Sequence, residues 1–133
     1  MVGELDHFRY GYGRAGNRLW RENVVSKNMA TPVYLDELYT YNGLDELVAT
    51  SRGQLNSAHT AILNEVFSQD WDLDAQGNWS SFDDNGASQT RTTDAANQIT
   101  GMTGGSATPV YDAAGNMTTI PSPTATDADH ASM

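Results

Sequence analysis

The chain has no cysteine and little positive charge. Without cysteine, disulfides, thiolate metal sites and a cysteine nucleophile are excluded. Seven Lys and Arg against 17 Asp and Glu give a formal net charge of −10. That balance argues against nucleic-acid binding, which draws most of its affinity from basic patches. It argues equally against attraction to an anionic membrane surface.

Long apolar segments are also missing. No run approaches the roughly 18 residues that a membrane span requires. The N-terminus lacks the basic region and the apolar stretch of a signal peptide. We therefore expect neither nucleic acid nor membrane as a partner, and the composition leaves the compartment open.

Aliphatic residues are scarce, and aromatic residues replace them. Leu, Ile, Val and Phe make up 22 of 133 residues, a share that at this net charge is typical of disordered chains. However, the tyrosines form pairs two residues apart, Tyr10/Tyr12 and Tyr39/Tyr41. Residues with this spacing lie on one face of a β-strand and bury large areas. The sequence thus predicts one ordered domain over residues 1–120, with a thin aromatic core, and a disordered tail over 121–133.

Five segments of the chain share one pattern, in which the second and fifth of six residues are Gly, Asn or Asp. They cover residues 12–17, 41–46, 73–78, 93–98 and 111–116. Asp or Asn caps the first corner of a type I turn, and a residue that tolerates positive φ closes the turn. The predicted closing residues are Gly16, Asp45, Gly77, Asn97 and Gly115.

Aromatic and aliphatic residues alternate with polar ones on both sides of these segments, which is the signature of β-hairpins. The sequence therefore predicts an all-β fold of consecutive antiparallel hairpins. A further turn is expected at 84–86, and residues 101–106 are predicted to be a flexible connection. For residues 54–67 two interpretations stay open: one short helix, because the apolar residues fall on a single helical face, or a loop or strand.

Two segments resemble a known repeat. Residues 10–19 read Tyr-x-Tyr-Gly-x-x-Gly-Asn-Arg-Leu, and residues 111–117 read Tyr-Asp-x-x-Gly-Asn-Met. They resemble the tyrosine–aspartate (YD) repeats of the Rhs proteins, which also occur in teneurins and in the shell component of insecticidal toxin complexes. The resemblance covers residues 8–120.

The resemblance implies a curved sheet of hairpins that coils into a hollow shell around a cargo, with no catalytic residues. It also implies a parent protein that is secreted or at the cell surface. Five repeats are too few to close such a shell, and the Asp-Pro-x-Gly self-cleavage core of the family is missing. The chain therefore looks like an internal fragment of a larger shell-forming protein.

Candidate catalytic residues are few. His7, with Asp6 beside it, and His59 could form an acid–base or metal site if the fold or a second chain brought them together. No zinc-binding spacing and no nucleophile elbow occurs. The alternative interpretation is that these histidines are exposed or lie at the edge of the core.

Residues 72–83 imitate a calcium loop. Asp72 and Asp74 stand at the first and third positions, Gly77 at the sixth and Asp83 at the twelfth, where oxygen ligands and a tight turn are needed. The alternative is that Asp74 and Gly77 serve the hairpin turn alone. No cofactor is predicted, although a divalent metal ion stays an open alternative.

The sequence thus favours a structural or interaction module over an enzyme. Open sheet edges and an uncovered aromatic face predict self-association, most simply as a homodimer with or without exchanged hairpins. The first alternative is a small ester or phosphoester hydrolase with its site between two subunits. The second is a carbohydrate-binding module, whose Tyr and Trp faces would stack on sugar rings.

Overall fold

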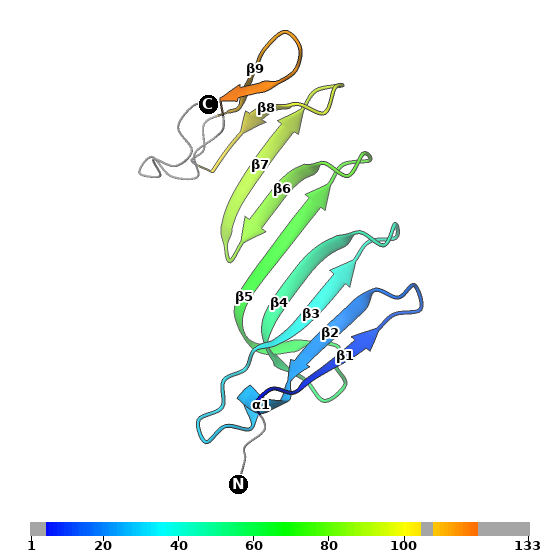
Figure 1. The fold of residues 1–133 in the computed structure, drawn as a ribbon, viewed down its shortest axis with the longest axis vertical. Helices are drawn as coiled ribbons and strands as arrows, with labels where there is room; N and C mark the ends of the chain where they lie inside the picture. Colours follow the sequence, from blue (N-terminus) through cyan, green and yellow to red (C-terminus); the bar gives the residue numbers. More distant parts are fainter. Residues whose placement is uncertain (1–4, 105–107, 120–133) are drawn as a thin grey trace. The chain divides into compact units, whose positions relative to one another are not determined.

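Eight strands that follow one another along the chain form the main sheet of the computed structural model, which describes residues 5–104 and 108–119 (Figure 1). They are β1 Phe8–Tyr12, β2 Arg18–Asn23, β3 Asp36–Tyr41, β4 Leu47–Leu55, β5 Ile62–Leu73, β6 Trp79–Asp84, β7 Ala87–Thr93 and β8 Ile99–Met102. Their spatial order is the sequence order, so each strand bonds to the next. A separate pair joins β9, Val110–Tyr111, to β10, Met117–Thr119. The prediction of an all-β fold of antiparallel strands is confirmed.

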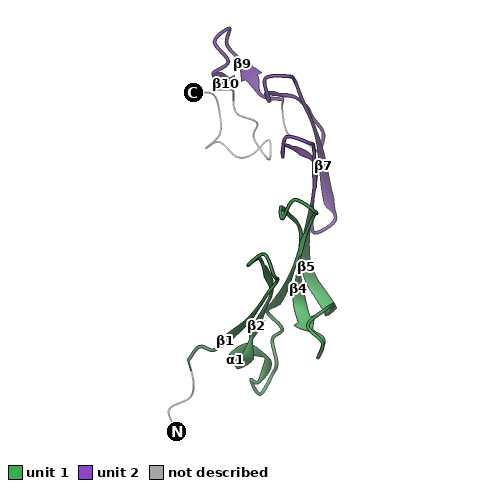
Figure 2. Ribbon diagram, turned by 90° about the vertical axis from the view of Figure 1, so that its right-hand side faces the viewer, with its two compact units in different colours: residues 1–70 green, residues 71–133 purple. Residues whose placement is uncertain are grey.

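The chain divides into two compact units, residues Met1–Asp70 and Trp71–Met133, which Figure 2 shows in two colours. One helical turn, α1 at Val24–Lys27, follows β2, and the Asn23 side chain caps it by accepting a hydrogen bond from the Ser26 amide. No helix in the described ranges is long and apolar enough to cross a membrane. The tail predicted over 121–133 lies outside the described residues.

The five predicted turns have the same backbone hydrogen bonds. Numbered from their first corner, the amide of residue 1 donates to the carbonyl of residue 5 at 2.8–3.0 Å, and the amide of residue 4 donates to the carbonyl of residue 1 at 3.0–3.1 Å. Residue 4 has a positive φ in every case: Gly16, Asp45, Gly77, Asn97 and Gly115, with φ from 61° to 87°. The residues that the sequence assigns to the closing position therefore occupy it.

In four of the five turns an acidic or amide side chain at residue 1 explains why the turn forms locally, whereas the first turn has Gly13 at this position. The Asp74 carboxylate accepts hydrogen bonds from the amides of Gln76 and Asn78, both at 2.9 Å. Asn42, Asp94 and Asp112 do the same in their turns. Each side chain thus satisfies two backbone donors that face away from the sheet ladder.

The helical interpretation of residues 54–67 is wrong. Leu55 ends β4, Ile62 begins β5, and the residues between them form a sixth turn. In this turn the Asn56 side chain accepts from the Thr60 amide at 2.9 Å, and His59 has a φ of 57°. A break in strand register between Arg52 and Gln54 shifts the alternation of β5. The apolar residues of 54–67 then fall at helix-like intervals, although the segment consists of strand and turn.

Two other connections also have local explanations. Asn85 and Gly86, with φ of 54° and 87°, make the tight turn expected between β6 and β7. Of the connection predicted over 101–106, the structure describes Thr103 and Gly104 after β8. The Thr103 amide donates a hydrogen bond to the Thr90 carbonyl of β7 at 3.0 Å. Gly104 has a φ of 84°, and a Cβ there would lie 2.8 Å from the Ser88 carbonyl oxygen. The prediction of a flexible connection is therefore wrong up to Gly104.

Buried side chains are mostly polar. Among the described residues, Leu55 is the buried hydrophobic side chain, whereas Glu22, Ser26, Asp36 and Glu37 are all buried. Tyr10, Tyr12, Leu63, Val66 and Trp79 remain at least 40% exposed. A sheet with so little buried apolar surface depends on hydrogen bonds and ion pairs for its order and exposes aromatic surface that a partner could cover.

Candidate functional site

A row of opposed residues crosses unit 1 (residues Met1–Asp70) from β1 to β5. The strand register places Tyr10 opposite Arg21, Arg21 opposite Glu37, Glu37 opposite Arg52, and Arg52 opposite Phe67. Directly opposed residues share one face of a sheet. We call this side of unit 1 the aromatic face, because Phe8 and Tyr12 alternate with Tyr10 along β1 on the same side.

Glu37 ties the aromatic face together. Its Oε1 accepts from Arg21 Nη2 at 2.8 Å and from Arg52 Nη2 at 2.7 Å, and the Tyr39 hydroxyl donates to its Oε2. Burial alone would raise the pKa of Glu37, but these hydrogen bonds and the two arginine charges outweigh it and lower the pKa. Burial, together with the bond to Glu37, raises the pKa of Tyr39.

The opposite face of unit 1 carries two further buried carboxylates. Asp36, 1% exposed, accepts from the amide of Asn23 at 2.8 Å and from the amide of Leu55 at 3.1 Å. It thereby joins three strands through their backbones. Glu22 pairs with Lys27 and lies 3.5 Å from Arg9. Burial raises the pKa of Glu22, but the bond from Lys27 and the neighbouring positive charges lower it overall.

The predicted acid–base residues lie at the margin of this second face. The His59 ring stacks on Trp20, with centroids 4.1 Å apart and planes at 13°. The backbone carbonyl of His7 accepts from the Val24 amide at 3.0 Å, and Asp6 is exposed. In the described ranges, no group of three or more His, Asp or Glu side chains could hold a metal ion.

The three calcium-loop candidates serve separate local contacts. Asp74 caps its turn and also accepts from Asn78 Nδ2 at 3.0 Å. Asp72 accepts from the Ser81 hydroxyl at 3.1 Å, and Asp83 accepts from the Gly86 amide at 2.7 Å. The structure does not bring Asp72, Asp74 and Asp83 together as a group that could bind a metal ion.

Contacts between successive hairpins recur in both units. In unit 1 the Tyr41 hydroxyl donates to the Arg18 carbonyl at 2.9 Å, and Asn17 Nδ2 donates to Asp45 Oδ1 at 2.9 Å. Tyr41 directly precedes one turn, and Arg18 directly follows the turn before it. A tyrosine thus joins its hairpin to the backbone of the preceding one.

Unit 2 (residues Trp71–Met133) repeats this arrangement. The Tyr111 hydroxyl accepts a hydrogen bond from the Ile99 amide at 3.1 Å, and Asn78 Nδ2 donates to Asn97 Oδ1 at 3.0 Å. Tyr111 again directly precedes a turn, and Ile99 directly follows the preceding one. In two of the hairpins, one in each unit, the tyrosine before the turn thus docks the hairpin onto the preceding one.

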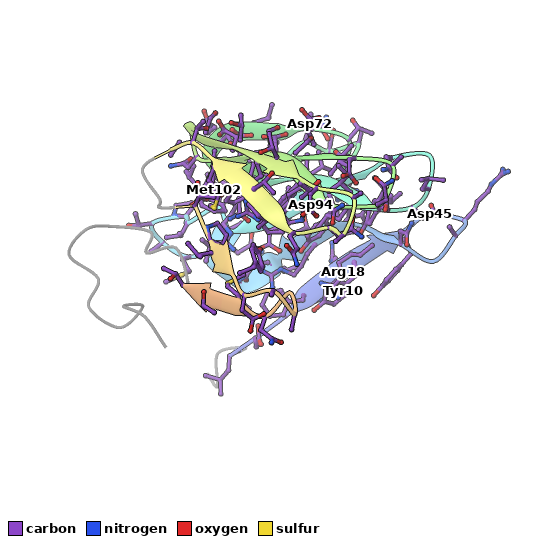
Figure 3. The ribbon with its side chains drawn as sticks, turned by 90° about the horizontal axis from the view of Figure 1, so that it is seen from above. Tyr10, Arg18, Asp45, Asp72, Asp94 and Met102 are labelled. Atoms are coloured by element: carbon purple, nitrogen blue, oxygen red, sulfur yellow. The ribbon has the colours of Figure 1, made fainter. Side chains whose placement is uncertain are left out.

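The outer edge of β1 presents an incomplete version of this contact. In the part of the chain that the structure describes, β1 bonds to β2 and to no other strand. Tyr12 occupies the position of Tyr41 and Tyr111 and is 59% exposed. Tyr10 lies beside it, and the Arg18 guanidinium covers the Tyr10 ring at 5.0 Å (Figure 3).

This edge is also basic. Residues 8–21 contain four arginines and no acidic residue, although the chain as a whole carries −10. By contrast, residues 71–133 contain eight acidic residues and one basic residue. Sequence reasoning singled out the aromatic residues but missed the buried Glu22, Asp36 and Glu37. The charged pairs Arg21-Glu22 and Asp36-Glu37, which lie next to apolar residues of β2 and β3, are the sequence signal that could have indicated them.

Comparison with protein-family models finds no match, and comparison with curated proteins finds none.

Proposed function

We propose that the chain is a structural and interaction module of Rhs-like YD hairpin repeats, a piece of a shell-forming protein that self-associates. The observation that carries this proposal is the tyrosine contact between hairpins. Tyr41 and Tyr111 each bond to the first residue after the preceding turn. A tyrosine directly before a turn belongs to the YD pattern, and at Tyr41 and Tyr111 this residue joins one hairpin to the one before it.

The β1 edge supports the second half of the proposal. An exposed, unpaired strand is a template for pairing with another chain. Tyr10 and Tyr12 are 42% and 59% exposed and lie with ring centroids 6.4 Å apart. The edge therefore offers backbone donors and acceptors together with an aromatic surface.

Charge favours a second copy of this chain as the occupant. The first hairpin, residues 8–21, has a net charge of +4, whereas residues 71–133 have a net charge of −7. Opposite patches steer association and fix its orientation. In the proposed assembly, the β1 edge of one copy meets an acidic hairpin of the other.

Hydrogen exchange tests this proposal at the edge itself. At rising protein concentration we expect slower exchange of the β1 amides and a higher thermal midpoint, because association protects the edge and stabilises the folded chain. Tyr12→Asp should abolish both effects. Leu44→Asp, at a turn residue that is 76% exposed, is the matched control and should leave them unchanged. Equal behaviour of the two variants would contradict the proposal.

No contact in the described residues favours the hydrolase alternative over this proposal. The carbohydrate-binding alternative is different, because unit 2 contains a cavity beside an exposed tryptophan.

A further inference from the structure

Arg91 differs from the strand arginines that pair with carboxylates. Arg21 and Arg52 bond to Glu37, and Arg9 pairs with Glu22. Arg91, on β7, donates its Nε to Gln89 Oε1 at 2.7 Å, and its guanidinium lies 4.8 Å from the centre of the Trp79 ring. Within the described residues its terminal nitrogens have no carboxylate partner. Burial lowers its pKa with no acidic neighbour to offset the effect.

Arg91 lines a cavity within unit 2. The cavity has a volume of about 270 Å³ and is lined by Gly77, Asn78, Trp79, Arg91, Thr93, Asn97 and Ile99. This volume lies just below the range of pockets for drug-sized ligands, which begins at about 300 Å³, and so suits a smaller molecule. One aromatic ring, one cation and two amide side chains thus converge on one hollow.

The geometry of Arg91 determines what the cavity can bind. The Trp79 ring lies beside the guanidinium, and Gln89 takes its Nε–H, so the terminal Nη groups are the donors that remain. Two N–H groups of a guanidinium match the two oxygens of a carboxylate. Asn97 accepts from Asn78 through Oδ1, so its own amide nitrogen still has donors to offer.

The acidic side chains of the two turns that border the hollow are engaged by their own turns. Asp74 bonds to the amides of Gln76 and Asn78, to Asn78 Nδ2 and to Thr93, and these donors lower its pKa. Asp94 accepts from the amides of Ala96 and Gln98. A single cation among neutral donors favours a singly charged ligand over phosphate or sulfate.

We propose that the hollow between the turns at 74–78 and 94–98 is a binding site for a small carboxylate ligand, with Arg91 as its anchor and Trp79 as its floor. The Asn97 amide donates to the carboxylate or to a neighbouring hydroxyl of the ligand. This site is separate from the β1 edge and does not depend on self-association.

Titration of the full chain with small carboxylates tests this site. The probes are the monocarboxylates acetate, D-glucuronate and N-acetylglycine, with neutral glucose as the comparison. The readouts are Trp fluorescence and the NMR signals of Arg91 Nε–H and the Asn97 side-chain amide. We expect saturable changes with the carboxylates and none with glucose. Tighter binding of glucuronate would identify a sugar acid, and tighter binding of N-acetylglycine would identify a peptide-like acid.

Substitutions assign the binding to the guanidinium. Arg91→Gln should abolish the response, and Arg91→Lys should weaken it about tenfold, because lysine retains the charge but not the planar fork. Arg14→Gln removes the same charge from an exposed turn of unit 1 and should have no effect. The concentration dependence of the thermal midpoint, measured in Arg91→Gln, separates this site from the proposed self-association and should be unchanged.

Two results would overturn the proposal. One is the absence of any carboxylate-induced change in the wild-type chain, which needs no variant to fold. The other is an equal response to glucose and glucuronate, which would show that Arg91 only packs against Trp79.

Discussion

The hydroxyl of Tyr41 donates a hydrogen bond to the backbone carbonyl of Arg18 at 2.9 Å, 23 residues earlier in the chain. The Tyr111 hydroxyl makes the corresponding contact with the amide of Ile99 at 3.1 Å. A tyrosine hydroxyl directly before a turn thus acts as donor in unit 1 and as acceptor in unit 2. Because both bonds are to backbone, they are indifferent to the side chain of the partner residue.

Removal of the Tyr41 hydroxyl tests its contribution to unit 1. Tyr41→Phe should lower the free energy of unfolding by about 0.5–1.5 kcal/mol, the usual net value of one hydrogen bond. Denaturant unfolding followed by tryptophan fluorescence measures it. Tyr34→Phe is the matched control, since no protein partner of the Tyr34 hydroxyl occurs among the described residues. An equal loss in both variants would refute the docking role of Tyr41.

The turns provide a second test, because two glycines of the same turn type differ in conformation. Gly16 has a φ of 87°, and a Cβ there would meet nothing within 4 Å. Gly16→Ala should therefore cost about 1–2 kcal/mol through backbone strain alone. Gly43 has equally open space and no positive φ. Gly43→Ala should be neutral or slightly stabilising, and a matching cost at the two sites would contradict the assigned turn geometry.

Acid should weaken unit 1 through its buried carboxylates. The pKa values of Glu22 and Glu37 are lowered from 4.5 in the folded chain. Their contribution to stability is therefore complete above about pH 4.5 and is lost as the pH falls through the folded values, because the unfolded chain then binds more protons. Urea unfolding at pH 7, 5, 4 and 3 should show that the free energy of unfolding falls between pH 5 and pH 3.

Asp74 and Asp112 also have lowered pKa values and so also contribute to the acid sensitivity. A variant of Glu37 distinguishes its contribution from theirs. Glu37→Gln should be less stable at pH 7 and should lose less stability between pH 5 and 3 than the wild type. Glu65→Gln, at an exposed position on β5, should keep the wild-type slope. A Glu37→Gln slope as steep as that of the wild type would show that this carboxylate does not cause the acid sensitivity.

Much of the fold could be predicted because its turns are chemically local. Asn, Asp and Gly at fixed positions cap and close a turn whatever lies around them, so the hairpins can be read from short segments. Residues 54–67 could not be read in this way. Their apolar spacing fits a helix, and the interruption in the register of β4 and β5 that produces it depends on the partner strand.

The buried carboxylates escaped prediction for a related reason. Glu37 is neutralised by Arg21 and Arg52, which lie 16 and 15 residues away along the chain. Only the strand register places them opposite one another. Arg91 and Trp79 are likewise residues of different strands, and nothing in their local sequence indicates that a cavity lies beside them.

Sedimentation velocity across a range of protein concentrations measures the proposed self-association itself. We expect the wild-type chain of 14.4 kDa to associate as concentration rises, whereas Tyr12→Asp stays monomeric and Leu44→Asp associates like the wild type. Monomeric wild-type protein at every concentration would contradict the proposed self-association through the β1 edge. So would an associating Tyr12→Asp variant.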